Sequence, residues 1–282
     1  MAATEWRWRS VDGLDMQARE WVPGGDRRGL VVLVHGFDEH GDRYRHVGEA
    51  LAAAGFAVCS YDVRGHGRSG GRRADVDRFE RYLDDLGAFL GLATARHPGL
   101  PRFLYGHSLG GNQVLNFLLR RRPALAGAVV TSPWLELAVK PPAWQVAAAR
   151  VASLFLGGVA LPTGMDANGI SRDPAVVQAY QADPFVGGKI TPRLLVQALD
   201  AGQWALAHAS ELQVPLLLLH GGSDQITSHG ATQRFARAAG PLVTFRTWPD
   251  SFHELHNEPD KAEVLAAITG WLGARVQGAP TG

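Results

Sequence analysis

The chain has 282 residues, 46% of them hydrophobic, so it is long enough to bury a large core as a single α/β unit. Its 28 Lys and Arg residues nearly balance 27 Asp and Glu residues, and a net charge of +1 does not indicate a nucleic-acid or anionic-membrane partner. The single cysteine, Cys59, excludes an internal disulfide and fits a reducing compartment.

The N-terminal region is expected to form a β-hairpin rather than a targeting signal. Its first ten residues, MAATEWRWRS, lack the apolar segment of a signal peptide. No run in the sequence has the apolar length needed to cross a bilayer, so we expect a cytoplasmic protein. Residues 5–10 and 14–22 are predicted to pair as antiparallel strands around Asp12-Gly13, a dipeptide that favours hairpin turns.

The chain then alternates between strands and helices. Continuous apolar runs indicate strands that are buried on both faces. The predicted strands are residues 30–36, 56–62, 102–108, 127–133, 214–224 and 242–250. The predicted helices are residues 44–54, 77–97, 109–122, 228–240 and 260–276. This alternation predicts an α/β fold, with a mostly parallel central sheet covered by helices on both faces.

Residues 134–190 interrupt the alternation. They contain several prolines and glycines and one mostly apolar helical stretch, residues 144–156. We interpret them as a cap (lid) inserted over one end of the sheet, which leaves residues 1–133 and 191–282 as the core. Apolar side chains in the helical stretch suit an acyl chain or a transient contact with a lipid surface, but we expect most of them to pack the cap on the sheet. They are Trp144, Val146, Val151, Leu154, Phe155 and Leu156.

The segment Gly106-His107-Ser108-Leu109-Gly110 matches the pattern G-x-S-x-G. A predicted strand precedes it and a predicted helix follows, which is the context of a turn that exposes a nucleophilic serine. Side chains two residues before and after the serine would collide with the neighbouring strand and helix, so glycine is required at both positions. The pattern therefore predicts Ser108 as a nucleophile, directed at the positive end of the following helix.

A serine hydroxyl needs a base to take its proton. The loop after the last predicted strand offers His253 and His256, and the central position of His253 favours it. The base in turn needs an acid that orients its ring. Asp224 follows a strand and lies between Ser108 and His253 in the sequence, which is the chain order expected of this type of fold.

Two other acids remain alternatives to Asp224. Glu136 follows the preceding predicted strand, and Asp250 lies three residues before the candidate base. The oxyanion formed in the reaction would need two backbone donors. They are expected to be the N–H of Leu109 and the N–H of Phe37, in the loop after residues 30–36.

Several other polar residues are expected to be structural. His35 is interpreted as a core histidine bonded to loop backbone, and Asp62 and Arg64 as residues that bond within the glycine-rich loop 62–71. The segment HELHNE could imitate a metal site, but no H-E-x-x-H or CxxC pair is present. Without GxGxxG or a Walker loop, we expect neither a metal nor a nucleotide cofactor.

Six segments together resemble the monoacylglycerol lipase group of α/β-hydrolases, also described as lysophospholipase-like or serine aminopeptidase-like. They are HGFDEHGDRY, SYDVRGHGRSGG, YGHSLGG, ISRDPAVVQAYQADPFV, LLLLHGGSDQIT and FHELHNE, and the likeness extends from about Arg27 to the C-terminal helix. The resemblance implies an α/β-hydrolase fold with a cap that carries an acyl pocket. The site residues that it implies are Ser108, Asp224 and His253 as the catalytic triad, with Phe37 and Leu109 as oxyanion donors.

The sequence departs from this group at two positions. Asp38 stands where the family loop HG-x-G-E-H usually has its second glycine, and the extra carboxylate could disfavour anionic substrates or stiffen the loop. Asn112 stands where a small residue is usual, and its side chain could pack under the turn that carries Ser108.

The expected function is a serine hydrolase that cleaves carboxylic esters, with monoacylglycerols or similar single-chain esters as the preferred substrates. A lysophospholipase, another carboxylesterase or a peptidase using the same residues is the first alternative. The second, from a different class, is a non-catalytic binding module with a hydrolase fold.

Overall fold

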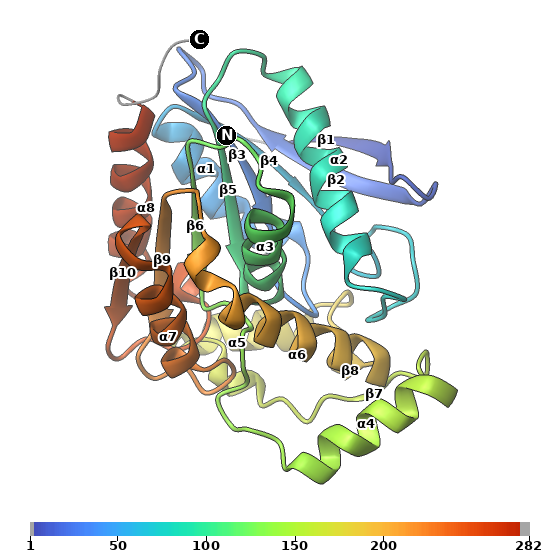
Figure 1. Cartoon of the computed structure of the whole chain (residues 1–282). Coiled ribbons are helices and arrows are strands. Elements are labelled where there is room, and N and C mark those ends of the chain that lie inside the picture. The colour runs from blue at the N-terminus through green and yellow to red at the C-terminus, as the bar shows by residue number, and fades with distance from the viewer. Residues whose placement is uncertain (1–2, 277–282) are drawn as a thin grey trace.

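The structure, a computed structural model, describes residues 3–276 and has an eight-stranded sheet at its centre (Figure 1). The strands of this sheet are β1 (Thr4–Arg9), β2 (Asp15–Trp21), β3 (Gly29–Val34), β4 (Phe56–Tyr61), β5 (Arg102–His107), β6 (Gly127–Thr131), β9 (Leu216–Gly221) and β10 (Val243–Trp248). A separate two-stranded antiparallel sheet, here called the β7–β8 strand pair, joins β7 (Leu161–Pro162) to β8 (Lys189–Ile190).

The α-helices are α1 (Arg45–Ala53), α2 (Glu80–Arg96), α3 (Ser108–Arg121), α4 (Ala143–Phe155), α5 (Pro174–Ala182), α6 (Pro192–Ala207), α7 (His229–Ala239) and α8 (Lys261–Val276). Short 3-10 helices occur at Gly41–Tyr44, Ala167–Gly169, Ala209–Glu211, Gly240–Leu242 and Leu255–Asn257. Every helix predicted from the sequence is present, although α2 begins three residues later than expected. Helices α5 and α6 were not predicted.

The strand order of the central sheet is β1-β2-β4-β3-β5-β6-β9-β10. Strands β1 and β2 pair antiparallel, as predicted, and β2 pairs antiparallel with β4. The remaining neighbours pair in parallel. The sheet is therefore mostly parallel, and the carboxyl ends of β3, β5, β6, β9 and β10 meet at one edge.

The two faces of the sheet are covered by different helices. On β3, Leu30, Val32 and Val34 belong to the core shared with α2, α3, α6 and α7. Val31 and Leu33 point to the opposite face and pack in the core shared with α1 and α8. Because successive strand residues point to opposite faces, a strand covered on both sides reads as a continuous apolar run.

Residues 134–190, here called the insertion, lie beyond one end of the sheet and contain α4, β7, α5 and β8 (Figure 1). Helix α6, which follows the insertion, packs against both α3 and α4 and so connects it with the sheet. The expectation that most apolar side chains of α4 pack on the sheet is wrong. No residue of α4 is buried, and Trp144, Leu154 and Phe155 are 69%, 77% and 81% exposed.

The exposed apolar surface of α4 does not make it a membrane-spanning segment. Within residues 3–276, no helix combines the length and the apolar character that crossing a bilayer requires. At 13 residues, α4 is also shorter than the roughly 20 residues needed to span the hydrocarbon core.

Candidate active site

Ser108 lies in a strained turn between β5 and α3. Its φ of +52° is in the left-handed region, which is unfavourable for any residue other than glycine. A Cβ atom on Gly106 would lie 2.5 Å from the carbonyl oxygen of Gly110, and one on Gly110 would lie 2.3 Å from that of Val34 on β3. Both positions therefore require glycine for the steric reason anticipated from the sequence.

Asp224 and His253, 29 residues apart in the chain, form a hydrogen bond. His253 Nδ1 lies 2.8 Å from Asp224 Oδ2. Burial opposes ionisation of Asp224, but the charge and hydrogen bonds of His253 and His220 hold its pKa well below the usual value. Burial alone would lower the pKa of His253, whereas the charge and hydrogen bond of Asp224 raise it above 6.5.

The Asp224 carboxylate has further donors. Its Oδ1 accepts hydrogen bonds from the backbone N–H groups of Ile226, at 2.8 Å, and Thr227, at 3.0 Å. Its Oδ2 lies 3.1 Å from His220 Nε2, a contact that the sequence reasoning missed. His220 stands four residues before Asp224 at the end of a buried strand, and that placement could have indicated the contact. These donors stabilise the charged carboxylate and fix its orientation.

The backbone of His253 is held by Ser132, a second residue that the sequence reasoning missed. Ser132 follows β6, has φ +44°, and its Oγ donates a hydrogen bond to the carbonyl oxygen of His253 at 2.8 Å. Thr227 Oγ1 lies 3.1 Å from the carbonyl oxygen of Ser132 and 2.9 Å from Asp224 Oδ2. One polar network thus connects the loops that follow β6, β9 and β10.

Ser108 and His253 line the same cavity, which has a volume of about 640 Å³ and lies between the sheet edge and the insertion. This volume is within the range of small-molecule sites. Phe37 and Trp134 line the cavity as well. In the described residues 3–276, the Ser108 hydroxyl does not form a hydrogen bond with His253. In sites without substrate, such bonds often shorten only when the substrate binds.

The alternative base and acids lie elsewhere. His256 is fully buried, is absent from the cavity lining, and burial lowers its pKa well below the usual value. Glu136 pairs with Arg234, 2.8 Å away, and Asp250 is exposed in a turn. Of the three candidate acids, only Asp224 contacts His253.

The two predicted oxyanion donors lie in different segments, Leu109 in α3 and Phe37 in the loop after β3. Leu109 is the second residue of α3, so its N–H has no acceptor within the helix. The N–H of Gly36, next to Phe37, donates to Glu39 Oε1 at 2.5 Å, and the Tyr44 hydroxyl donates to the same oxygen at 2.7 Å. Glu39, which the sequence reasoning did not consider, therefore fixes the start of this loop.

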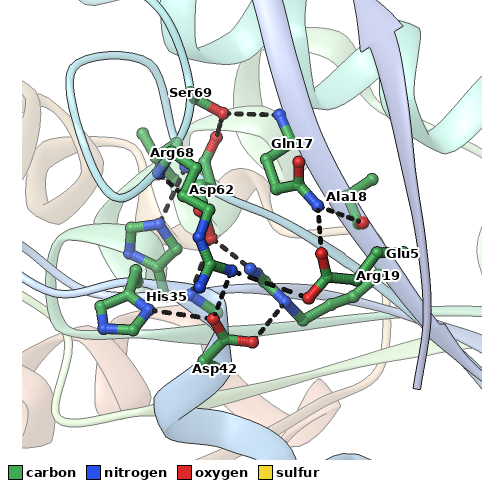
Figure 2. Close-up of polar contacts among 12 residues, drawn as sticks. Glu5, Gln17, Ala18, Arg19, His35, Asp42, Asp62, Arg68 and Ser69 are labelled. Carbon is green, nitrogen blue, oxygen red and sulfur yellow. Dashed lines mark hydrogen bonds and ion pairs between the residues drawn. The ribbon is translucent and has the colours of Figure 1, made fainter. Parts of the chain in front are cut away.

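Asp62 contacts Gly41 at the end of the same loop, and Figure 2 shows its polar surroundings. Its carboxylate accepts hydrogen bonds from Arg19 Nη1 at 2.6 Å, from the N–H of Gly41 at 2.9 Å and from the N–H of Arg68 at 2.8 Å. Burial would raise the pKa of Asp62, but the charge and hydrogen bond of Arg19, together with the hydrogen bond from the Arg68 N–H, lower it below the usual value. The structural role predicted for Asp62 fits these contacts, although two of them reach outside its loop.

Two further predictions concern residues near this loop. His35 is buried, its Nδ1 lies 2.7 Å from the carbonyl oxygen of Gly36, and its Nε2 accepts from the N–H of Val63, so it is a core histidine as predicted. Arg64 bonds within its own loop through its backbone carbonyl oxygen, 3.0 Å from His66 Nδ1, but the prediction is wrong for its side chain. Its guanidinium pairs instead with Asp85 on α2 at 2.6 Å and with Asp12 at 3.0 Å.

Asn112 lies directly under the turn that carries Ser108. It is buried, and its Nδ2 donates to the carbonyl oxygens of Trp134, at 2.7 Å, and Ala198, at 3.0 Å. The N–H of Trp134 in turn donates to the carbonyl oxygen of Ser108 at 3.0 Å. Asn112 therefore connects α3 with the first residues of the insertion and with α6.

Glu20, Cys59 and His97 form a buried cluster whose potential ligand atoms all lie within 4.8 Å of one another. The sequence analysis did not foresee this cluster. Arg96 pairs with Glu20 at 2.6 Å, and Arg27 Nη1 lies 3.0 Å from His97 Nδ1. Burial raises the pKa of the Cys59 thiol to about 12. Glu20 and His97 also contact each other, so Arg96, Glu20, His97 and Arg27 form a hydrogen-bonded chain that accounts for the positions of Glu20 and His97.

Comparisons with known proteins point in one direction. Residues 25–260 match the family described as serine aminopeptidase, S33. The monoacylglycerol lipase of Mycolicibacterium smegmatis is 35% identical over 271 residues, which covers 95% of this chain and 96% of that protein. The phospholipase YtpA of Bacillus subtilis is 27% identical, over 88% of this chain and 96% of that protein. The crystal structure of Paleococcus ferrophilus monoacylglycerol lipase matches with a TM-score of 0.83 and 30% identity, over 98% of this chain and 100% of that one.

Proposed function

The chain belongs to the serine aminopeptidase S33 family, and on that premise we propose that it is a serine hydrolase of carboxylic esters, with monoacylglycerols as its preferred substrates. One observation carries the proposal. Ser108, in its strained turn, lines the same cavity as His253, which is hydrogen-bonded to the buried Asp224. The similarity to a monoacylglycerol lipase over nearly the whole of both chains supports this choice of substrate.

In the proposed acylation step, Ser108 Oγ attacks the ester carbonyl carbon while His253 Nε2 takes the hydroxyl proton. Asp224 keeps the proton of His253 on Nδ1 and stabilises the imidazolium that forms. The N–H groups of Leu109 and Phe37 donate to the oxyanion of the tetrahedral intermediate. The intermediate collapses when His253 gives its proton to the leaving alcohol, and the acyl group remains on Ser108.

In the deacylation step, His253 takes a proton from a water molecule as the water oxygen attacks the acyl-enzyme carbonyl carbon. The same two amides stabilise the second oxyanion. Collapse of this intermediate releases the carboxylic acid and returns the proton to Ser108. The site then holds the same groups as before, so each turnover consumes one ester and one water.

The walls of the cavity favour a substrate with an acyl chain. Most of the side chains that the insertion contributes to it are apolar. Those side chains include Leu137, Ala148, Ala152, Leu161, Pro162 and Met165. We propose that the insertion is a cap and that it covers the acyl chain while the ester lies at Ser108.

A substrate panel tests this function. The purified chain would be assayed with 1-monooleoylglycerol, with 1-oleoyl-lysophosphatidylcholine and with an aminoacyl p-nitroanilide, and kcat/KM compared. We expect the monoacylglycerol to give the highest value. Absence of turnover of every ester in the panel would contradict the proposal.

Lysophospholipid hydrolysis is the second candidate, because the Bacillus subtilis relative is named a phospholipase. The chemistry at Ser108 would be the same, and only the leaving group would differ. A kcat/KM for the lysophospholipid above that for the monoacylglycerol would select this function.

The pH dependence of the reaction follows from the Asp224–His253 pair. Only neutral His253 can take the Ser108 proton, so activity is lost as pH falls through the pKa of this imidazole. Asp224 raises that pKa above 6.5, so we expect the acid limb of kcat/KM to have its midpoint above 6.5. Initial rates on a soluble ester between pH 5 and 9 would test this. A midpoint well below 6.5 would show that another group limits the rate.

We also propose that α4 makes a transient contact with lipid surfaces, because Phe155 and Leu154 are largely exposed. Burying one such side chain in lipid contributes enough free energy to change affinity by roughly tenfold. Phe155→Asp should therefore weaken sedimentation with phosphatidylcholine vesicles by about tenfold or more. Val11→Asp, at an exposed apolar position of the β1–β2 turn, is the matched control. Equal vesicle binding by both variants would contradict the proposed contact.

A further inference from the structure

Asp38 follows Phe37, and its side chain does not line the cavity. The residue is 6% exposed and has φ +55°, in the region that favours glycine. Its Oδ1 accepts a hydrogen bond from the N–H of Gly187 at 2.8 Å, and its Oδ2 accepts one from the N–H of Gly188 at 2.7 Å. Two successive backbone amides thus bind both oxygens of one carboxylate, an arrangement typical of anion binding by backbone.

The charge of Asp38 is satisfied mainly by this contact. In the part of the chain that the structure describes, residues 3–276, Asp38 forms no ion pair. Hydrogen bonds to an ionised acceptor are stronger than those between neutral groups, and a buried carboxylate that loses its donors is costly. The carboxylate therefore resists separation of the loop after β3 from residues 187–188.

The other side of this contact is part of the cavity wall. Gly188 directly precedes β8, and its carbonyl oxygen accepts from the N–H of Thr163, which follows β7, at 2.9 Å. Leu161 and Thr163, on the β7 side, and Ile190 on β8 line the cavity. Asp38 consequently connects the loop that carries Phe37 with the β7–β8 strand pair that bounds the space for the substrate.

A second contact joins the same two segments. His40 Nε2 lies 2.8 Å from Asp183 Oδ2, and the ring of Phe185 packs against the His40 ring with centroids 5.3 Å apart. Residues 38–40 and 183–188 are thus joined at two points. With two points fixed, the segment 183–188 and the β7–β8 strand pair that it leads into have little freedom to rotate or slide relative to the loop.

We propose that Asp38 is a positioning residue that fastens the β7–β8 strand pair to the loop carrying Phe37, and that through this contact it sets the preference for long acyl chains. The inference rests on the proposed ester hydrolysis. A long acyl chain fills the cavity as far as the β7–β8 strand pair and gains most binding free energy when that wall is already in place. A short acyl group stays near Ser108 and makes few contacts with the β7–β8 strand pair.

Two variants separate the carboxylate from the backbone conformation. Asp38→Gly removes both hydrogen bonds, and glycine adopts φ +55° without strain. Asp38→Asn keeps the size of the side chain and tolerates this φ, but its amide retains an oxygen for only one of the two N–H groups. Arg122→Gly is the control, because Arg122 has φ +47° and lies at the remote end of α3.

The readout is the ratio of kcat/KM for p-nitrophenyl decanoate to kcat/KM for p-nitrophenyl acetate. We expect this ratio to fall about tenfold in Asp38→Gly and by less in Asp38→Asn, and to stay unchanged in Arg122→Gly. A loss of stability alone would lower both rates together and leave the ratio unchanged. A ratio in Asp38→Gly equal to that of the native chain would overturn the proposal.

Native-state hydrogen exchange tests the contact without relying on activity. The amides of Gly187 and Gly188 should exchange at least about tenfold faster in Asp38→Gly than in the native chain or in Arg122→Gly. Unchanged exchange rates at both amides would show that Asp38 does not hold residues 187–188 in place. If the native chain hydrolysed no ester, the proposed function would fail, while this measurement would still decide whether Asp38 holds the β7–β8 strand pair.

Discussion

Replacing Ser108 with alanine should lower kcat for a soluble p-nitrophenyl ester about ten-thousandfold or more. The variant loses the only atom that can form the acyl-enzyme, while the oxyanion donors and the cavity remain. Binding of substrate should change little, so the loss should appear in kcat rather than KM. Covalent labelling by a fluorophosphonate probe should disappear together with turnover.

The Ser108→Ala variant should fold normally, because alanine and serine are similarly strained at φ +52° and the variant removes a single atom. Thermal unfolding followed by circular dichroism would check this. Ser153→Ala, on the exposed helix α4, is a matched control that should label and turn over like the native chain. Turnover of the ester by Ser108→Ala at the native rate would contradict the proposed mechanism. Failure of the native chain to label would instead favour a non-catalytic binding module.

The fold could be predicted because its strands are covered on both faces. A strand such as β3 then has apolar side chains at every position, and this signal is present in the sequence itself. The α/β-hydrolase fold expected from the motifs is confirmed by the similarity to a solved relative over 98% of the chain. The turn around Ser108 was predictable for a local reason, since Gly106 and Gly110 leave no room for a Cβ atom.

Features that depend on distant contacts could not be predicted. Helix α4 has an apolar sequence, which normally indicates burial, yet no residue of α4 is buried. Asp38 was expected to disfavour anionic substrates or to stiffen its loop, but the sequence could not identify its two amide donors, which lie about 150 residues away. Neither the exposure of α4 nor the contact of Asp38 with the two amides produces a hydrophobic period in the neighbouring sequence. Hydrophobic pattern describes which side chains prefer burial, and it does not say which surface is available to bury them.

The residues that support His253 in the candidate active site could not be predicted either. Asp224 and His253 were identified from their positions after strands. Ser132 and His220, which contact them, also follow or end strands; Ser132 lies in none of the six quoted segments, and His220 lies in LLLLHGGSDQIT without a role that the segment itself indicates. Their contribution depends on three loops meeting at one edge of the sheet. Such supporting residues become evident only once the strand order is known.

Replacing Asp224 with asparagine should lower kcat about ten-thousandfold while leaving the fold intact. The asparagine carbonyl oxygen can still accept from the N–H groups of Ile226 and Thr227, as Oδ1 does now. The amide nitrogen then replaces Oδ2 and donates a hydrogen bond to His253 Nδ1. Donation to Nδ1 forces the His253 proton onto Nε2, and an Nε2–H cannot accept the proton of Ser108.

The pH profile distinguishes this effect from a general loss of structure. Removing the Asp224 charge should lower the pKa of His253, because that charge is what raises it, so the acid limb of the residual activity should move to lower pH. His220→Gln changes the other histidine that contacts the same carboxylate, and we expect a much smaller loss of kcat. An Asp224→Asn variant with kcat within about tenfold of the native value would show that the imidazole acts without this carboxylate, since loss of the correct tautomer costs far more.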